Sequence, residues 1–110
     1  MFYTLLMKTT PFLEYVLYDL FSESEPVTWR PMMGAHMLYY EGRPFAIVEN
    51  DELYFKGSKE TKDWYLERGG KQFTYKKKGE DASLYYFFVP EEVCEDREVF
   101  KEWMEVACSL

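Results

Sequence analysis

The spacing of hydrophobic positions changes along the chain, from a helical period near the N-terminus to strand-like runs and back to a helical period. Thr10-Pro11 is typical of a helix start, because a hydroxyl side chain can cap a helix that has proline at its first position. Apolar residues then recur at helical spacing, which predicts helices over residues 11–22, about 59–68 and 97–108. The residues that mark the other helix boundaries are Ser58, Gly69, Gly70 and Asp96.

The middle of the chain indicates three strands joined by short turns. Gly34 would mark a bulge or bend in the first strand, and Asn50-Asp51 is a typical two-residue hairpin turn. A second hairpin is predicted after the second helix. Connections this short force antiparallel pairing. The predicted strands cover residues 29–40, 45–49, 53–56, 73–77 and 84–89, with the second hairpin turning at 79–81 and Pro90 closing the last strand.

The predicted order of elements is α-β-β-β-α-β-β-α, and its grouping of strands favours an α+β fold with a five-stranded antiparallel sheet. The chain has 110 residues, so we expect a single domain over residues 1–110, with residues 1–9 as a loose N-terminal extension. Strands 45–49 and 84–89 carry apolar residues at consecutive positions, which predicts that both faces of the sheet are covered. Helices can cover one face, and something else must cover part of the other.

Composition narrows the classes of partner. The net charge is −7, and the one basic run, residues 76–78, is followed directly by Glu80-Asp81. Phosphate backbones repel such a chain, so we expect no direct binding to DNA. Aromatic residues make up 20% of the chain, which is more than one small core needs to bury. Because exposed apolar patches are usually used, this excess predicts a homodimer.

The cysteines and the N-terminus indicate the compartment. Cys94 and Cys108 lack a metal-type spacing, and a secreted disulfide scaffold would carry more cysteines. We therefore expect two reduced thiols in a cytoplasmic protein. The N-terminal run MFYTLLMK is a poor signal peptide and too short to span a membrane, so no membrane association is predicted.

His36 is the single histidine and the first candidate for chemistry. A zinc site needs three or four ligands, and a catalytic triad needs a nucleophile and an orienting acid around the histidine. No serine lies in a Gly-x-Ser-x-Gly motif, and the acidic clusters at turns lack calcium-binding spacing. We predict that His36, Cys94 and Cys108 form no common metal or catalytic site, that the protein is not an enzyme, and that it needs no cofactor.

The run RPMMGAHMLYYEGRPFAIVENDELYFKG, residues 30–57, resembles the N-terminal domain of the TfoX/Sxy family, bacterial regulators of natural competence. Later, FTYKKKG and YFFVPEE match the second hairpin of the family and its proline-acidic exit, and the likeness covers about residues 10–107. Met33 stands where the family usually has Phe, and Ala35 and His36 replace glycine-like positions. Family members usually carry a helical second domain as well, and we expect residues 1–110 to correspond to the N-terminal domain only. The resemblance implies a secretion-chaperone-type sheet with helices packed on it. The matching residues are Arg30, Met32, Gly34, Leu38, Tyr39, Gly42, Phe45, Ala46, Leu53, Tyr54, Phe55, Lys56, Phe73, Tyr75, Gly79, Tyr86 and Pro90.

Five residues of this stretch are candidates for binding a partner. Arg30 falls between apolar neighbours, where it would be either half of a structural ion pair or an anchor for another protein. Methionine suits adaptable binding surfaces, although the core is the more usual place for most residues of the group Met32, Met33, Tyr39 and Tyr40. The first hypothesis is a non-enzymatic protein-interaction domain that regulates competence or transcription. The alternative is a domain that binds a small ligand on an aromatic face of the sheet.

Overall fold

The structure is a computed structural model that describes residues 10–21, 27–32 and 34–109. The first predicted helix is confirmed over α2, Pro11–Tyr15, and its continuation as a π-helix, η1, Val16–Leu20. The Thr10 side chain accepts a hydrogen bond from the backbone N–H of Leu13 at 3.1 Å, as expected for the cap. The last predicted helix is confirmed as α5, Arg97–Cys108, with Asp96 accepting from the backbone N–H of Val99 at 3.2 Å.

Two helical details differ from the prediction. The second helix, α3, Lys62–Glu67, is shorter than predicted, because Ser58 and Thr61 bond to each other in a preceding turn. It ends where predicted, at Gly69, whose φ of +95° lies in the left-handed region that favours glycine. After Pro90 the chain also forms a short helix, α4, Glu91–Cys94, which was not among the predicted helices.

The fold class is confirmed, with one strand more than expected. The described residues form a single antiparallel sheet of six strands in the order β1-β2-β3-β4-β6-β5. The turn at Asn50-Asp51 is confirmed, with φ of +55° and +61°, whereas the second hairpin turns at Lys78-Gly79, one residue before the predicted position. The strands are β1 Val27–Met32, β2 Ala35–Tyr40, β3 Arg43–Glu49, β4 Glu52–Lys56, β5 Gln72–Lys77 and β6 Glu80–Phe88.

The prediction of one strand over residues 29–40 was wrong. This segment is a hairpin in which β1 pairs with β2, from Val27 opposite Tyr40 to Met32 opposite Ala35. Gly34 is a turn residue rather than a bulge, and its φ of +87° is the conformation that lets the chain reverse there. β1 is therefore an outer strand of the sheet.

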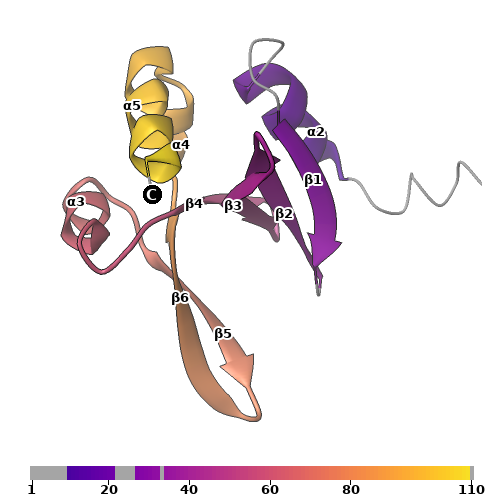
Figure 1. Ribbon diagram of the computed structural model, residues 1–110, viewed down its shortest axis with the longest axis vertical. Helices are drawn as coiled ribbons and strands as arrows, with labels where there is room; N and C mark the ends of the chain where they lie inside the picture. Colours follow the sequence, from indigo (N-terminus) through magenta and orange to yellow (C-terminus); the bar gives the residue numbers. More distant parts are fainter. Residues whose placement is uncertain (1–9, 22–26, 33, 110) are drawn as a thin grey trace, which may run out of the picture.

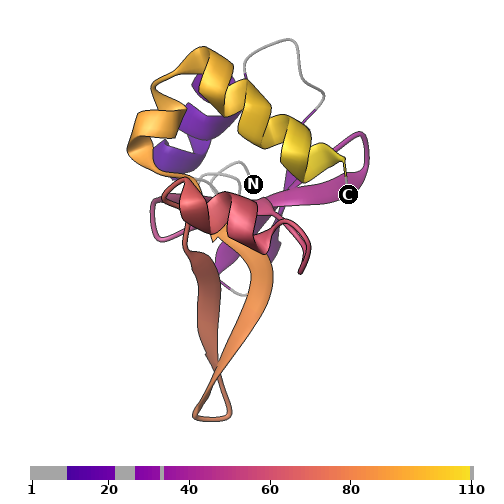
Figure 2. The same cartoon turned by 90° about the vertical axis from the view of Figure 1, so that its left-hand side faces the viewer.

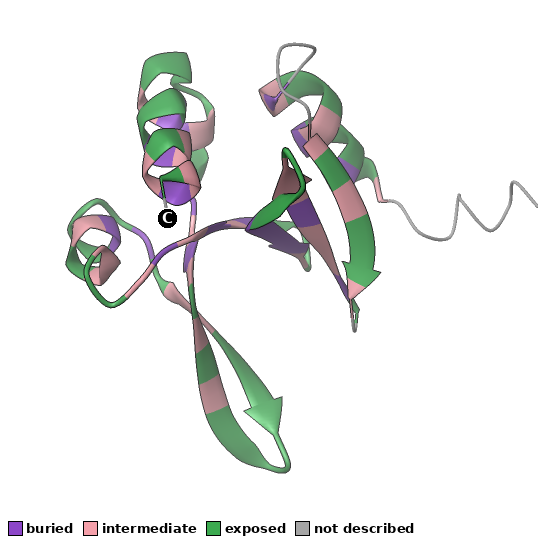
Figure 3. Cartoon of the chain, viewed as in Figure 1, coloured by how far each residue is buried: buried purple, intermediate pink, exposed green. Residues whose placement is uncertain are grey.

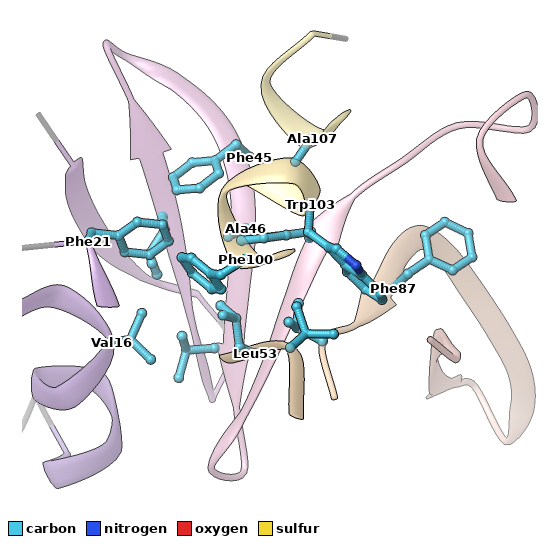
Figure 4. Packing of buried hydrophobic residues seen from close by; sticks show 14 of the residues in the cluster. Val16, Phe21, Phe45, Ala46, Leu53, Phe87, Phe100, Trp103 and Ala107 are labelled. Atoms are coloured by element: carbon cyan, nitrogen blue, oxygen red, sulfur yellow. The ribbon is translucent and has the colours of Figure 1, made fainter. Parts of the chain in front are cut away.

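The helices lie on one side of the sheet, and the β5–β6 ribbon extends away from the body of the molecule (Figures 1 and 2). The core lies between the helices and the sheet, where Figure 4 shows Phe21, Phe45 and Phe100. The ring of Phe21 lies 5.4–6.4 Å from those of Phe45, Phe55 and Phe100, centroid to centroid. Every described helix adds side chains to this cluster. They include Leu13, Val16, Tyr65, Val93, Phe100 and Trp103.

The expectation that both sheet faces are covered holds for β3 and fails for β6. Four consecutive residues of β3, from Phe45 to Val48, are buried. In β6, half-buried residues alternate with exposed ones from Ala82 to Tyr86, and Tyr85 is 45% exposed. Figure 3 shows the exposed stretches of the ribbon in green. The ribbon reaches beyond the helices, so most of its residues have contacts with the neighbouring strand and with solvent alone. None of the described helices has the length and apolar composition that spanning a lipid bilayer requires.

Candidate functional site

The sheet face turned away from the helices carries a continuous band of large side chains, which we call the open face. Strand pairing places Met37 opposite Ile47, Ile47 opposite Tyr54, and Tyr54 opposite Phe88, all on this face. None of the side chains in this band is part of the core cluster that the helices cover. Its residues are Arg30, Met32, Met37, Tyr39, Ile47, Tyr54, Phe73, Tyr86 and Phe88.

The open-face side chains contact one another. The ring of Tyr54 lies edge-on to Phe73 and Phe88, with centroids 5.0 and 6.0 Å away. The Tyr86 hydroxyl donates to the Sδ atom of Met37 at 3.8 Å, bridging two strands that are not neighbours in the sheet. Ile47 is 0% exposed, whereas the residues around it are half-buried. These rings therefore form a second, shallow cluster that keeps part of its apolar surface in water.

Two tyrosines of this face, Tyr54 and Tyr86, stay neutral at physiological pH, because the pKa of each is raised. Burial raises the pKa of Tyr54. The hydrogen bond that its hydroxyl donates to the Glu52 carboxylate, at 2.7 Å, raises this pKa further. Burial also raises the pKa of Tyr86, with a smaller contribution from Tyr39. The phenols therefore present hydroxyl donors and apolar rings rather than charges.

Arg30 lies on outer strand β1, at the side of the open face. Its guanidinium carbon lies 5.7 Å from the centroid of the Tyr39 ring, within the range of a cation–π contact. Although Arg30 falls between apolar neighbours in the sequence, its side chain is exposed. An outer strand leaves room for a long side chain to reach water over its neighbour.

The five candidate partner-binding residues separate into groups. Arg30, Met32 and Tyr39 lie on the open face, since they alternate in register with Met37 across the β1–β2 pair. Tyr40 lies on the helix side, where its ring centroid is 6.2 Å from that of Phe45. Met33 lies outside the described residues.

The central open-face residues were missed by sequence reasoning. Alternation in β6 groups Tyr86 with Phe88, and alternation in β4 isolates Tyr54, but neither pattern says which face the helices cover. Phe73 joins them through a register shift in β5, which the sequence does not announce.

The three residues weighed for chemistry lie on different elements. His36, in β2, packs edge-on to Trp29 with ring centroids 5.3 Å apart. Cys94 lies in α4 and Cys108 ends α5. Burial raises the pKa of the Cys94 thiol to about 11, and the carboxylates of Glu91 and Glu95 add to this effect. Such a thiol is a poor nucleophile at neutral pH. Within the described residues, no three His, Cys, Asp or Glu side chains gather into a group that could hold a metal ion.

The fold is therefore an α+β domain with helices on one face of its sheet and an aromatic band on the other. A family model described as the TfoX N-terminal domain matches residues 19–109, so the chain belongs to that family. The resemblance noted in the sequence is thereby confirmed. The family is associated with competence regulation and is of a regulatory type. The chain matches none of the curated proteins.

Proposed function

We propose that this chain is a non-enzymatic protein-interaction domain that acts in the bacterial cytoplasm, in the regulation of competence or transcription. Its partner, another protein or a second copy of the chain, docks on the open face. The observation that carries the proposal is the half-buried aromatic band itself, because an interior would bury these rings fully and an ordinary surface would not gather them.

The residue types support a protein partner. Residues that contribute most to protein interfaces are enriched in tyrosine and arginine, and both occur here in arranged contacts. Arg30 lies over Tyr39, while Tyr54 and Tyr86 offer hydroxyl groups beside apolar rings. Methionine lets a surface adapt to its partner, and Met37 lies at the centre of the band. Docking would remove these rings from water, which is favourable by roughly 25 cal/mol per Å2 of apolar area.

The test is partner capture from the source organism with the wild-type chain and two charge-reversed variants. Arg30→Glu changes the open face. Arg68→Glu is the matched control, because Arg68 is also exposed and lies over an aromatic ring, that of Trp64, at 4.2 Å on α3. Tyr86→Ser and Tyr85→Ser form a second pair, since these neighbours point to opposite faces of β6.

If the partner is another protein, we expect the Arg30 and Tyr86 variants to lose it in the capture experiment, while both controls retain it. If the partner is a second copy of the chain, light scattering should show these two variants as monomers and both controls as dimers. Equal behaviour of each test variant and its control would contradict the proposal. Native mass spectrometry of the purified chain separates the alternative: a copurifying small molecule that Tyr86→Ser releases would assign the open face to ligand binding instead.

A further inference from the structure

A concave surface lies on the helix side, between α2–η1 and α4. It begins as a cleft of about 470 Å3 and continues into a hollow of about 210 Å3 that shares Tyr15, Cys94 and Glu95 with it. The first volume lies within the usual range of ligand sites. We call the two together the α2–α4 groove. It has one residue, Phe88, in common with the open face.

The α2–α4 groove has an apolar floor. Leu53 and Val89 are buried there, and Phe100 lines the far end. The wall on the α2 side is aromatic, with the rings of Phe12 and Tyr15 6.0 Å apart. Tyr15 is 37% exposed, so its ring is accessible to a ligand in the groove.

Five of the six charged residues that line the α2–α4 groove are acidic, so its rim carries net negative charge. Arg97 is the one basic residue among those that line it. Within the described part of the chain, none of its acidic side chains forms an ion pair, although Glu52 accepts the hydrogen bond from Tyr54. The exposed acidic residues of the rim are Asp19, Asp51, Glu52, Glu91 and Glu95.

The titration of groups inside the groove agrees with this charge. Burial raises the pKa of Tyr15, and Cys94 together with Asp19, Glu95 and Glu91 raises it further. The negative potential is therefore felt by the residues that line the groove and not by solvent alone. An anionic ligand would meet this repulsion, whereas a cation would relieve it.

We propose that the α2–α4 groove binds a lysine- and arginine-rich segment of a partner protein. Such a segment supplies cations for the rim and for the faces of Phe12 and Tyr15, and apolar side chains for Leu53 and Val89. A small polyamine has the charge but lacks the side chains that would cover the floor. The proposal concerns a different surface from the open face and does not depend on it.

The test uses fluorescence anisotropy of a labelled synthetic peptide of alternating lysine and leucine, titrated with the full chain at low salt. The same peptide with glutamate in place of lysine is the negative probe. Glu91→Gln/Glu95→Gln neutralises two rim charges. Glu98→Gln/Glu102→Gln is the matched control, since it makes the same change in net charge at exposed positions of α5 that do not line the groove.

A second pair of variants tests the aromatic wall. Tyr15→Ser removes a ring of the groove, and Tyr18→Ser removes a 71% exposed ring three residues further on that does not line it. Urea unfolding of each variant verifies that it is folded. Arg30→Glu on the open face is expected to leave peptide binding unchanged.

We expect the lysine peptide to bind more weakly as salt is raised, and the glutamate peptide not to bind. The Glu91/Glu95 double variant should lose affinity by roughly fivefold or more, and the Glu98/Glu102 control by less than about twofold. Equal losses in both double variants would mean that net charge alone attracts the peptide, and would overturn the proposal. Equal losses in Tyr15→Ser and Tyr18→Ser, or displacement of the peptide by an equal concentration of spermine, would overturn it as well.

Discussion

Replacing Gly57 by alanine adds one methyl group at the most crowded glycine described in the chain. A Cβ atom there would lie 2.7 and 2.8 Å from Cε1 and Cδ1 of Phe87 and 2.9 Å from Cε2 of Tyr65. Carbon atoms pack at about 3.5–4.0 Å, so each contact is too short by at least about 0.6 Å. Both rings are 0% exposed and stacked on each other, with centroids 4.8 Å apart, and the Tyr65 hydroxyl is tied to the Lys56 carbonyl at 2.8 Å.

The expected cost follows from this confinement. Overpacking a rigid core by a methyl group costs about 1–3 kcal/mol. The φ of Gly57 is not positive, so alanine can adopt this backbone conformation without strain. Alanine also has fewer conformations than glycine in the unfolded chain, which offsets about 0.4–1 kcal/mol of the packing cost. We therefore expect Gly57→Ala to lower the free energy of unfolding by roughly 1–2 kcal/mol, a large part of the 5–15 kcal/mol typical of a domain.

Urea unfolding followed by tryptophan fluorescence measures this difference, since Trp64 and Trp103 lie beside Tyr65. A double-mutant cycle locates its cause. Gly57→Ala should cost less in a Phe87→Leu background, because the two closest ring atoms are gone. It should cost the same amount in a Phe100→Leu background, because Phe100 supplies none of the three closest atoms. A change within about 0.5 kcal/mol of wild type, or equal costs in both backgrounds, would refute the packing argument.

Three further predictions concern pH, assembly and DNA. Because the pKa of Cys94 is raised in the folded state, the thiol of the unfolded chain ionises first as pH rises. Between about pH 9 and 11 the folded state therefore binds more protons, and the free energy of unfolding falls. In urea titrations across this range, the free energy of unfolding of Cys94→Ser should fall by roughly 1–2 kcal/mol less than that of the wild type, and an identical fall would contradict the assignment. Light scattering at micromolar concentration should report a dimer, and a monomer at all concentrations would refute the homodimer. The isolated protein should not bind duplex DNA even at low salt, because its net charge is −7 and Lys76 is paired with Asp81 at 2.7 Å. A dissociation constant below about one micromolar that rises steeply with salt would contradict this prediction.

The sequence predicted those elements whose boundaries are marked by local chemistry. The helix over residues 97–108 was predicted to the residue, because Asp96 caps it and its apolar period is unbroken. The hairpin at residues 27–40 was missed, because the chain is apolar on both sides of its turn and a single glycine marks the reversal. Local sequence can indicate that a glycine is needed there, but a bulge and a turn require the same residue.

The open face could be predicted only in part, because it is defined by where the helices are absent. A register shift near Leu38 and Tyr39 lets Phe45 and Ala46 both join the core, although they are consecutive residues of β3. From the sequence alone, consecutive apolar residues indicate a strand with two apolar faces. Nothing in the local sequence indicates which of the two faces the helices leave uncovered. All four of Arg30, Tyr39, Tyr54 and Tyr86 match the family motif. The sequence indicated only Arg30 and Tyr39 as partner-binding residues, whereas the strand order was needed to place Tyr54 and Tyr86 beside them.

The two edges of the sheet bear on how a partner reaches the open face. Outer strand β1 contains Pro31, which lacks a backbone N–H, and outer strand β5 carries exposed Lys76 and Lys77. Proline and lysine on outer strands disfavour the pairing of another strand. A partner is therefore expected to contact the side chains of the face rather than extend the sheet. Strand addition relies on main-chain hydrogen bonds and would tolerate the Arg30→Glu change, whereas side-chain docking over Tyr39 would not, so that one variant separates the two modes of binding.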